Sequence, residues 1–175
     1  MKNIISILLF SLSFSLAAES QGQSSANKKP GAEPIFILDS VRINRNALDQ
    51  IQANDISTIS VYKDEHAIKL FGADGANGVV CIETKKFART KYWRFLKSKS
   101  AEYRQAVPSP EADSNVVYIL NGSVLAKDAE STLSSITDET FLDLKVIDKQ
   151  TLSKQYGLAN RSIGVMINIK KKPSQ

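Results

Sequence analysis

The chain has 175 residues, of which 42% are hydrophobic and 23% are charged, a balance typical of a globular protein with enough apolar residues for a core. A single cysteine excludes a disulfide framework, and a single histidine excludes a multi-histidine metal centre. We therefore expect neither a metal nor a cofactor. A large membrane barrel is also excluded at this length, because each spanning strand needs about 9–11 residues plus its turns.

The N-terminus has the three parts of a secretory signal peptide. Lys2 gives a basic start, residues 4–16 form an uncharged apolar run, and small residues precede a cleavage point after Ala18. A membrane anchor or a buried helix is the alternative, but the run is shorter than the ~20 residues that a spanning helix needs. We expect residues 1–18 to be a signal peptide and the mature chain to be periplasmic, without a transmembrane span. Association with the outer membrane is a further expectation.

Residues 19–34 are mostly Gln, Ser, Asn, Lys, Pro and Gly. Such a segment cannot bury enough apolar surface to offset the entropy of ordering it. It is therefore predicted to be a flexible tether.

One pattern of elements then occurs twice, which indicates an internal repeat. Each copy opens with an apolar strand and a tight turn, at Asp39-Ser40 in the first copy and at Asn121-Gly122 in the second. Asn-Gly between apolar runs is a strong hairpin signal, because a type I′ turn needs a positive φ at both central residues. A second strand follows in each copy, over residues 56–61 and 142–146.

A short helix comes next in each copy. Asp64 and Asp148 are expected as its N-caps, and Gly72 and Gly157 are expected in the left-handed conformation just past its end. A Gly-rich or Asn-rich turn then leads to a third, closing strand. The glycines to which we assign a structural role in these turns are Gly72, Gly75, Gly78, Gly157 and Gly164.

The sequence thus predicts an α+β fold of two tandem units, residues 35–86 and 115–172. Each unit is a small mixed sheet with a hairpin, a short helix and a closing strand, three strands in all. Residues 87–114 are predicted to be a basic helical connector between them. Each unit lies near the lower size limit for independent folding, so the two are expected to pack on each other.

The start of the connector is the most strongly charged part of the chain. Residues 85–104 contain eight Lys or Arg and one Glu, whereas the whole chain has a net charge of only +5. Tyr92, Leu96 and Tyr103 lie at helical spacing among these charges, which predicts an amphipathic helix that ends before Pro108 and Pro110.

Two interpretations of this helix remain open. Its aromatic residues can pack between the two units while the charges stay in solvent, or its charges can bind an anionic glycan, lipid or peptidoglycan of the envelope. Nucleic acid is not expected, because the chain is exported. The candidate residues for an anionic contact are Lys91, Arg94, Lys97 and Lys99.

The residues of catalysis are scarce, and we expect no enzyme. His66 is the single histidine that could act as a base, and no serine lies on a recognisable nucleophile turn. The glycine-rich turn 72–78 follows a helix and opens a strand, the reverse of a phosphate-binding loop.

The first copy resembles the plug domain of TonB-dependent outer-membrane receptors, in the variety found in Bacteroidetes nutrient transporters. Ser40 stands where that family usually has Gly, and the second copy is divergent. The residues that carry the resemblance are Val61-Tyr62-Lys63-Asp64, Ala67, Phe71-Gly72 and Gly75-Ala76-Asn77-Gly78-Val79 in the first copy, with Asn121-Gly122, Tyr156-Gly157 and Gly164 in the second.

The resemblance implies an orphan plug-like module without a barrel. We therefore expect a non-enzymatic binding or scaffolding module that contacts an envelope protein, for example by adding a strand at an exposed sheet edge. The alternative function is recognition of an anionic envelope component through the basic helix.

Overall fold

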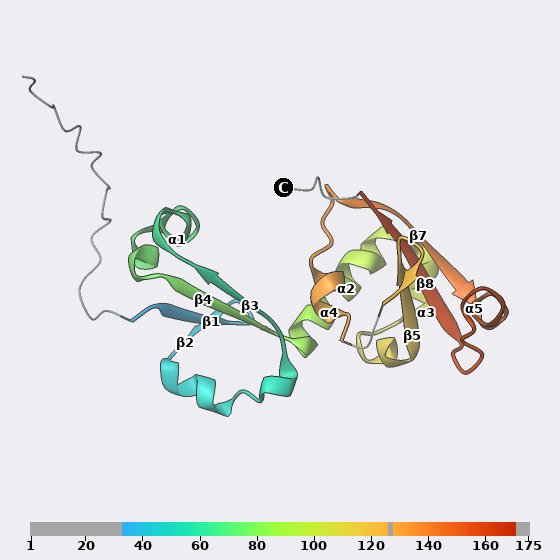
Figure 1. Ribbon diagram of the computed structural model, residues 1–175, viewed down its shortest axis with the longest axis horizontal. Helices are drawn as coiled ribbons and strands as arrows, with labels where there is room; N and C mark the ends of the chain where they lie inside the picture. Colours follow the sequence, from blue (N-terminus) through green and yellow to red (C-terminus); the bar gives the residue numbers. More distant parts are fainter. Residues whose placement is uncertain (1–32, 126–127, 171–175) are drawn as a thin grey trace, which may run out of the picture.

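The computed structural model describes residues 33–125 and 128–170. The expected signal peptide (1–18), most of the expected tether and residues 171–172 of the second unit lie outside the described residues. Two separate sheets are seen, each accompanied by short helices (Figure 1). Within the described residues, no helix is both long enough and apolar enough to cross a membrane.

The first sheet has the strand order β2-β1-β4-β3. Its strands are β1 (Ile35–Leu38), β2 (Val41–Ile43), β3 (Ile56–Tyr62) and β4 (Val79–Thr84). β1 pairs antiparallel with β2 and parallel with β4, and β4 pairs antiparallel with β3. The connections are two 3₁₀ helices, η1 (Arg45–Gln50) and η2 (Ala53–Asp55), between β2 and β3, then α1 (Asp64–Phe71) and η3 (Gly72–Asn77) between β3 and β4.

The second sheet has the equivalent order, β6-β5-β8-β7, with the same parallel and antiparallel pairings. Its elements are η4 (Glu111–Asn115), β5 (Val116–Leu120), β6 (Ser123–Val124), α4 (Glu130–Ser134), β7 (Phe141–Asp148), α5 (Lys149–Tyr156) and β8 (Ile163–Ile169). The α+β class and the mixed sheets are as predicted. The prediction of three strands in each unit was wrong, because the second arm of each hairpin also pairs in the sheet and forms a fourth strand.

Both hairpins turn through two residues of positive φ. Asn121 and Gly122 have φ values of 48° and 83°, and Asp39 and Ser40 have values of 49° and 70°. The first hairpin thus has a turn of the same handedness as the second but contains no glycine, although most residues with a Cβ, such as serine, disfavour a positive φ.

The first residue of each turn also holds the end of the closing strand. Asp39 Oδ1 accepts a hydrogen bond from the Thr84 backbone N–H at 2.7 Å, and Asn121 Oδ1 accepts one from the Ile169 N–H at 2.9 Å. The last residue of the opening strand pairs with Ile82 in the first sheet and with Ile167 in the second. In both sheets the donor of this hydrogen bond lies two residues further along the closing strand. The two sheets therefore share this detail as well as their topology.

Replacing Ser40 with glycine should stabilise the protein by about 0.5–1 kcal/mol, because glycine adopts a positive φ without the clash that a Cβ makes. Urea denaturation followed by circular dichroism measures the change. The control is Ser98→Gly inside helix α2 (Lys85–Lys99), where glycine should instead lower stability by a similar amount. A Ser40→Gly variant that is less stable than the wild type would contradict the positive φ of residue 40.

The two equivalent helices begin differently. Asp148 is the N-cap of α5, as predicted, and its side chain accepts a hydrogen bond from the Thr151 N–H at 2.8 Å. The expectation for Asp64 was wrong: the N-cap of α1 is Lys63, which makes no side-chain cap, and Asp64 is the first residue of the helix itself.

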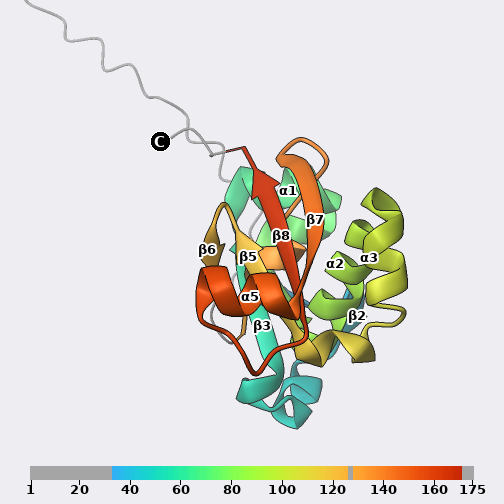
Figure 2. The same ribbon diagram turned by 90° about the vertical axis from the view of Figure 1, so that its right-hand side faces the viewer.

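The second sheet is covered on both faces. On one face, Val117, Ile119 and Ile147 pack with Leu152 of α5. On the other face, a larger cluster is formed with α2, α3 (Ala101–Ala106), α4 and the segments next to them (Figure 2). The buried members of this helical core are Tyr92, Leu96, Tyr103, Val107, Tyr118, Leu133, Ile136, Val165 and Ile167.

The basic connector is therefore part of the second core. Its aromatic residues do not pack between two equal units, since Tyr92, Leu96 and Tyr103 are all buried against the second sheet. It is also two helices, because Ser100 is extended (φ −144°, ψ 125°) and caps α3 by accepting a hydrogen bond from the Tyr103 N–H. α3 ends at Ala106, ahead of the two prolines, as expected.

Candidate functional site

The four candidate residues for an anionic contact have different surroundings. Lys91 forms an ion pair with Glu83 at 2.9 Å, and Lys99 forms one with Asp138. Lys97 Nζ lies 4.3 Å from the centre of the Trp93 ring. Arg94 is exposed. Two of the four charges are thus already neutralised by neighbouring carboxylates, which reduces the positive surface that the sequence suggested.

Other charges of α2 attach the helix to the segment that contains α4. Lys85 Nζ lies 2.6 Å from Asp128 Oδ1, and Arg89 Nη2 lies 2.8 Å from Glu130 Oε1. The hydrogen bond from Lys85 to Asp128 raises the pKa of the Lys85 ammonium, and the bond from Arg89 to Glu130 raises the pKa of the Arg89 guanidinium. Much of the basic character of α2 therefore serves internal packing.

A buried carboxylate, which the sequence did not single out, lies behind these charges. Asp113 accepts hydrogen bonds from the hydroxyls of Tyr92 and Tyr118, and the Tyr118 and Tyr103 hydroxyls lie 2.8 Å apart. Arg89 Nε is 4.0 Å from Asp113 Oδ2. Because these residues come from α2, α3, η4 and β5, the network ties the helices to the second sheet.

Burial controls the protonation of this network. Desolvation raises the pKa of Asp113 above its usual range, although the two tyrosine hydroxyls and Arg89 oppose the shift. Desolvation also raises the pKa of Tyr92, Tyr103 and Tyr118, so the hydroxyls remain protonated donors. The tyrosines supply no ionised nucleophile, and because the oxygens of Asp113 are taken up by hydrogen bonds to Tyr92 and Tyr118, we interpret the network as structural.

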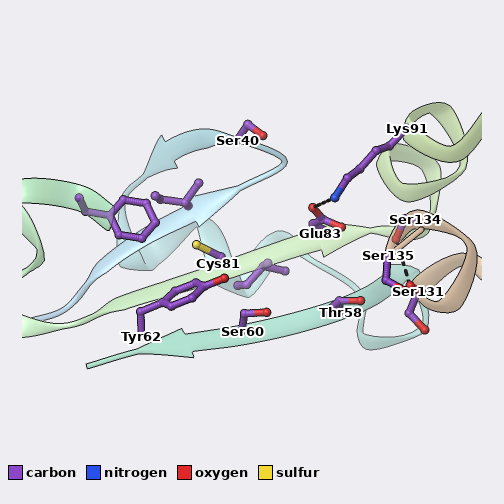
Figure 3. A pocket seen from close by; sticks show the side chains of 13 residues that line it. Ser40, Thr58, Ser60, Tyr62, Cys81, Glu83, Lys91, Ser131, Ser134 and Ser135 are labelled. Carbon is purple, nitrogen blue, oxygen red and sulfur yellow. Dashed lines mark hydrogen bonds and ion pairs between the residues drawn. The ribbon is translucent and has the colours of Figure 1, made fainter. Parts of the chain in front are cut away.

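On one face of the first sheet lies a polar trough with a cavity volume of about 480 Å³ (Figure 3). Figure 3 shows hydroxyl groups along β3 and the serines of the α4 segment at one end. Burial, and then Glu83, raise the pKa of the Cys81 thiol, which therefore remains protonated at neutral pH. The polar residues that line this trough are Ser40, Thr58, Ser60, Tyr62, Cys81, Glu83, Lys91, Ser131, Ser134 and Ser135. Within residues 33–125 and 128–170, no group of three or more His, Cys, Asp or Glu could hold a metal ion.

Four of the five glycines singled out by the sequence lie at helix ends and turns, but the expectation for Gly164 was wrong, because it lies in strand β8 and pairs with Val117 and Ile147. Gly157 follows α5 in the left-handed conformation (φ 70°, ψ 17°), as predicted. Gly72 follows α1 with a positive φ of 66° but a ψ of −154°, which is not the predicted left-handed helical conformation, and Gly78 has a φ of 91°. A Cβ on Gly75 would lie 2.6 Å from the carbonyl carbon of Ala67, and a Cβ on Gly164 would lie 2.7 Å from side-chain atoms of Ile147 and Leu152. These positions have conformational roles at helix ends and turns and, at Gly75 and Gly164, packing roles.

The opposite face of the first sheet is apolar in its paired positions apart from Thr84, at the end of β4. Residues that pair across neighbouring strands point to the same side of a sheet, and successive residues alternate. This apolar face consists of Phe36, Leu38, Val41, Ile43, Ile59, Val61, Val80 and Ile82. Ile59 and Val61, both on β3, are each 55% exposed.

The second sheet shows how the equivalent face is covered. Ile59 pairs with Ile82 and Val61 with Val80; the corresponding residues of β7, Leu144 and Val146, pair with Ile167 and Val165. Leu144 and Val146 pack against the helical core. Both clusters of buried hydrophobic residues found in the described chain lie around the second sheet. The apolar face of the first sheet therefore lacks an equivalent of the layer formed by α2 and α3.

Beyond the β-bulge between Ile56 and Thr58, the edge of this face has little protection. Natural sheets protect edge strands with charged residues, prolines or short length. β2 and β6 have only three and two residues, and β7 carries Asp143, Lys145 and Asp148. β3 has seven residues, Ile-Ser-Thr-Ile-Ser-Val-Tyr, without a charge or a proline, and within the described residues it pairs only with β4. The absence of charge in this segment was visible in the sequence; its edge position was not.

Comparison with known proteins gives partial matches. No family model matches this chain, and no solved structure is significantly similar. A 54-residue alignment covering 30% of the chain is 41% identical to TonB-dependent receptor P26 of Formosa agariphila. A 73-residue alignment covering 38% of the chain is 33% identical to TonB-dependent receptor SusC of Bacteroides thetaiotaomicron. The matched segments make up 6% and 7% of those receptors, respectively. Over part of its length, this chain is therefore related to TonB-dependent receptors.

Proposed function

We propose that the chain is an exported, non-enzymatic plug-like module that acts in the cell envelope by contact with another protein. The partial similarity to two TonB-dependent receptors supports the receptor-like character of the module. The resemblance of residues 61–79 to a plug motif supports assigning that character to the first sheet. The non-enzymatic role is supported by the structural character of the Asp113 network and by the protonated state of Cys81.

The observation that carries the proposal is the exposed β3 side of the apolar face of the first sheet, where Ile59 and Val61 are open to solvent although Ile82 beside them is buried. Fully burying an aliphatic side chain contributes roughly 1.5–3 kcal/mol, so covering the exposed halves of Ile59 and Val61 provides a driving force for association. The adjoining edge of β3 can accept a further strand through its backbone groups. The contact surface therefore consists of β3 and the apolar face beside it.

A double substitution of Ile59 and Val61 with lysine should abolish the contact, because a charged edge resists both burial and strand addition. The measurement is in vivo cross-linking of the full chain, with the captured proteins identified by mass spectrometry. Leu142→Lys on β7 is the matched control, since Leu142 is 53% exposed on the edge strand of the second sheet.

The proposal fails if the Ile59→Lys/Val61→Lys variant captures the same proteins as the wild type, or if Leu142→Lys loses them equally. Fractionation of the same cells tests the compartment. The proposal expects the chain in the periplasmic or outer-membrane fraction, and recovery in the cytoplasm would contradict it.

A further inference from the structure

We infer that the partner at β3 is a second copy of this chain, paired antiparallel to the first about a two-fold axis near Ile59. This inference rests on the proposed function, because it names the occupant of the same surface. The β3 edge has the length, the uncharged sequence and the exposed aliphatic side chains that edge-to-edge pairing needs.

Charge complementarity selects a second copy. β3 is preceded by Asp55 and followed by Lys63, and both side chains are exposed; the acidic residues after Lys63, Asp64 and Glu65, belong to the first turn of α1 and not to the strand. A strand with a negative residue at one end and a positive residue at the other is complementary to itself when it runs antiparallel. A pair centred on Ile59 places the end of η2, with Asp55, of each copy towards Lys63 of its partner, so opposite charges flank an uncharged centre.

The same arrangement matches the faces of the two sheets. A two-fold axis at Ile59 sets this residue against its own copy on the apolar side, and Val61 lies two residues away on the same side. The apolar faces of the two copies then form one continuous surface across eight strands. Side-chain hydroxyls of Thr58 and Ser60 face each other on the trough side.

The predicted interface is small. It involves one seven-residue strand from each copy, and interfaces below about 1,200 Å² are typical of weak, reversible complexes. A β-bulge between Ile56 and Thr58 and the neighbouring α4 segment restrict the first part of the strand. We therefore expect a concentration-dependent dimer that weakens as salt screens its end charges.

A charge-reversal experiment tests the arrangement in solution by sedimentation velocity over a concentration series. Asp55→Lys and Lys63→Asp each replace two attractions by two repulsions, and each variant alone should dimerise about tenfold more weakly than the wild type. An equimolar mixture of the two variants should restore dimerisation, because each reversed residue then meets its opposite. Asp49→Lys and Lys69→Asp are the matched controls, since both residues are exposed and lie outside β3.

Cysteine cross-linking tests the register. Residues directly opposite in an antiparallel pair have Cα atoms about 4.5–5.5 Å apart, which is within the range that a disulfide bridges. In a Cys81→Ser background, Ile59→Cys should form a covalent dimer under mild oxidation, whereas Leu142→Cys should not.

A wild-type chain that is monomeric at all concentrations, a mixture that stays monomeric, or equal cross-linking by Leu142→Cys would overturn the inference. The proposed function is judged separately. If the chain is monomeric but Ile59→Lys/Val61→Lys abolishes cross-linking to a different envelope protein, the second copy is wrong and the binding role stands. If neither effect occurs, both are wrong.

Discussion

Replacing Asp113 with alanine is expected to destabilise the second core by about 3–5 kcal/mol, because removing one partner of a buried charged network leaves the others unsatisfied. Asp113 is only 7% exposed in its side chain, and its loss leaves the Tyr92 and Tyr118 hydroxyls without their acceptor. Trp93, the single tryptophan of the chain, packs against this core and reports its unfolding by fluorescence in a urea titration.

The control is Asp113→Asn, which keeps the shape and can still hydrogen-bond both tyrosines. Asp113→Asn should lower the free energy of unfolding by much less than Asp113→Ala does. Because burial raises the pKa of Asp113 in the folded state, the stabilising contribution of the group is complete below its ordinary pKa of 3.8 and declines as the pH rises through the folded value. The wild type should therefore lose stability relative to Asp113→Asn as the pH increases above about 4. A constant difference between the two proteins, or an increasing advantage of the wild type, would contradict a raised pKa.

Replacing Leu96 with alanine is expected to cost about 2–5 kcal/mol, as is typical for a large aliphatic residue removed from a packed core. Leu96 is fully buried in the helical core, although it lies in the segment that the sequence marks as a connector. The loss should appear in Trp93 fluorescence, since both residues belong to α2.

Leu70→Ala on α1 serves as the comparison, because Leu70 is 54% exposed and its truncation should change stability by less than about 0.5 kcal/mol. Equal effects of the two substitutions would mean that α2 is a solvated linker. A selective effect of Leu96→Ala would identify α2 as an integral helix of the second core.

These two predictions concern the point at which the two halves of the chain diverge. Both sheets have the same strand order, and in both a turn residue, Asp39 or Asn121, holds the end of the closing strand. The second sheet has α2, α3 and α4 on one face and α5 on the other. The first sheet retains an exposed apolar rim at Ile59 and Val61. Helices of the same chain therefore cover the second sheet, whereas in our proposal a partner covers the exposed part of the first sheet.

The sequence by itself determined the elements and their order. Asn-Gly and the alternating apolar residues of 142–146 encode a turn and a strand through local backbone preferences, and the spacing of Tyr92, Leu96 and Tyr103 encodes a helical face. These signals are short-range, so they can be recognised without knowing what packs against them. The same approach failed at Asp64, where the neighbouring Lys63 took the N-cap position.

Only the tertiary structure decided what covers each element. The charges of α2 look like a basic surface in sequence, but Lys85, Arg89, Lys91 and Lys99 meet carboxylates from β4 and from residues 113–138. Asp113 looks like an ordinary acidic residue in sequence, but in the fold it accepts hydrogen bonds from Tyr92 and Tyr118, and Tyr103 contacts the second of these. The uncharged segment of β3 becomes an interaction surface only because strand order places it at an edge. Such properties depend on contacts between residues distant in the chain, which periodicity and composition do not encode.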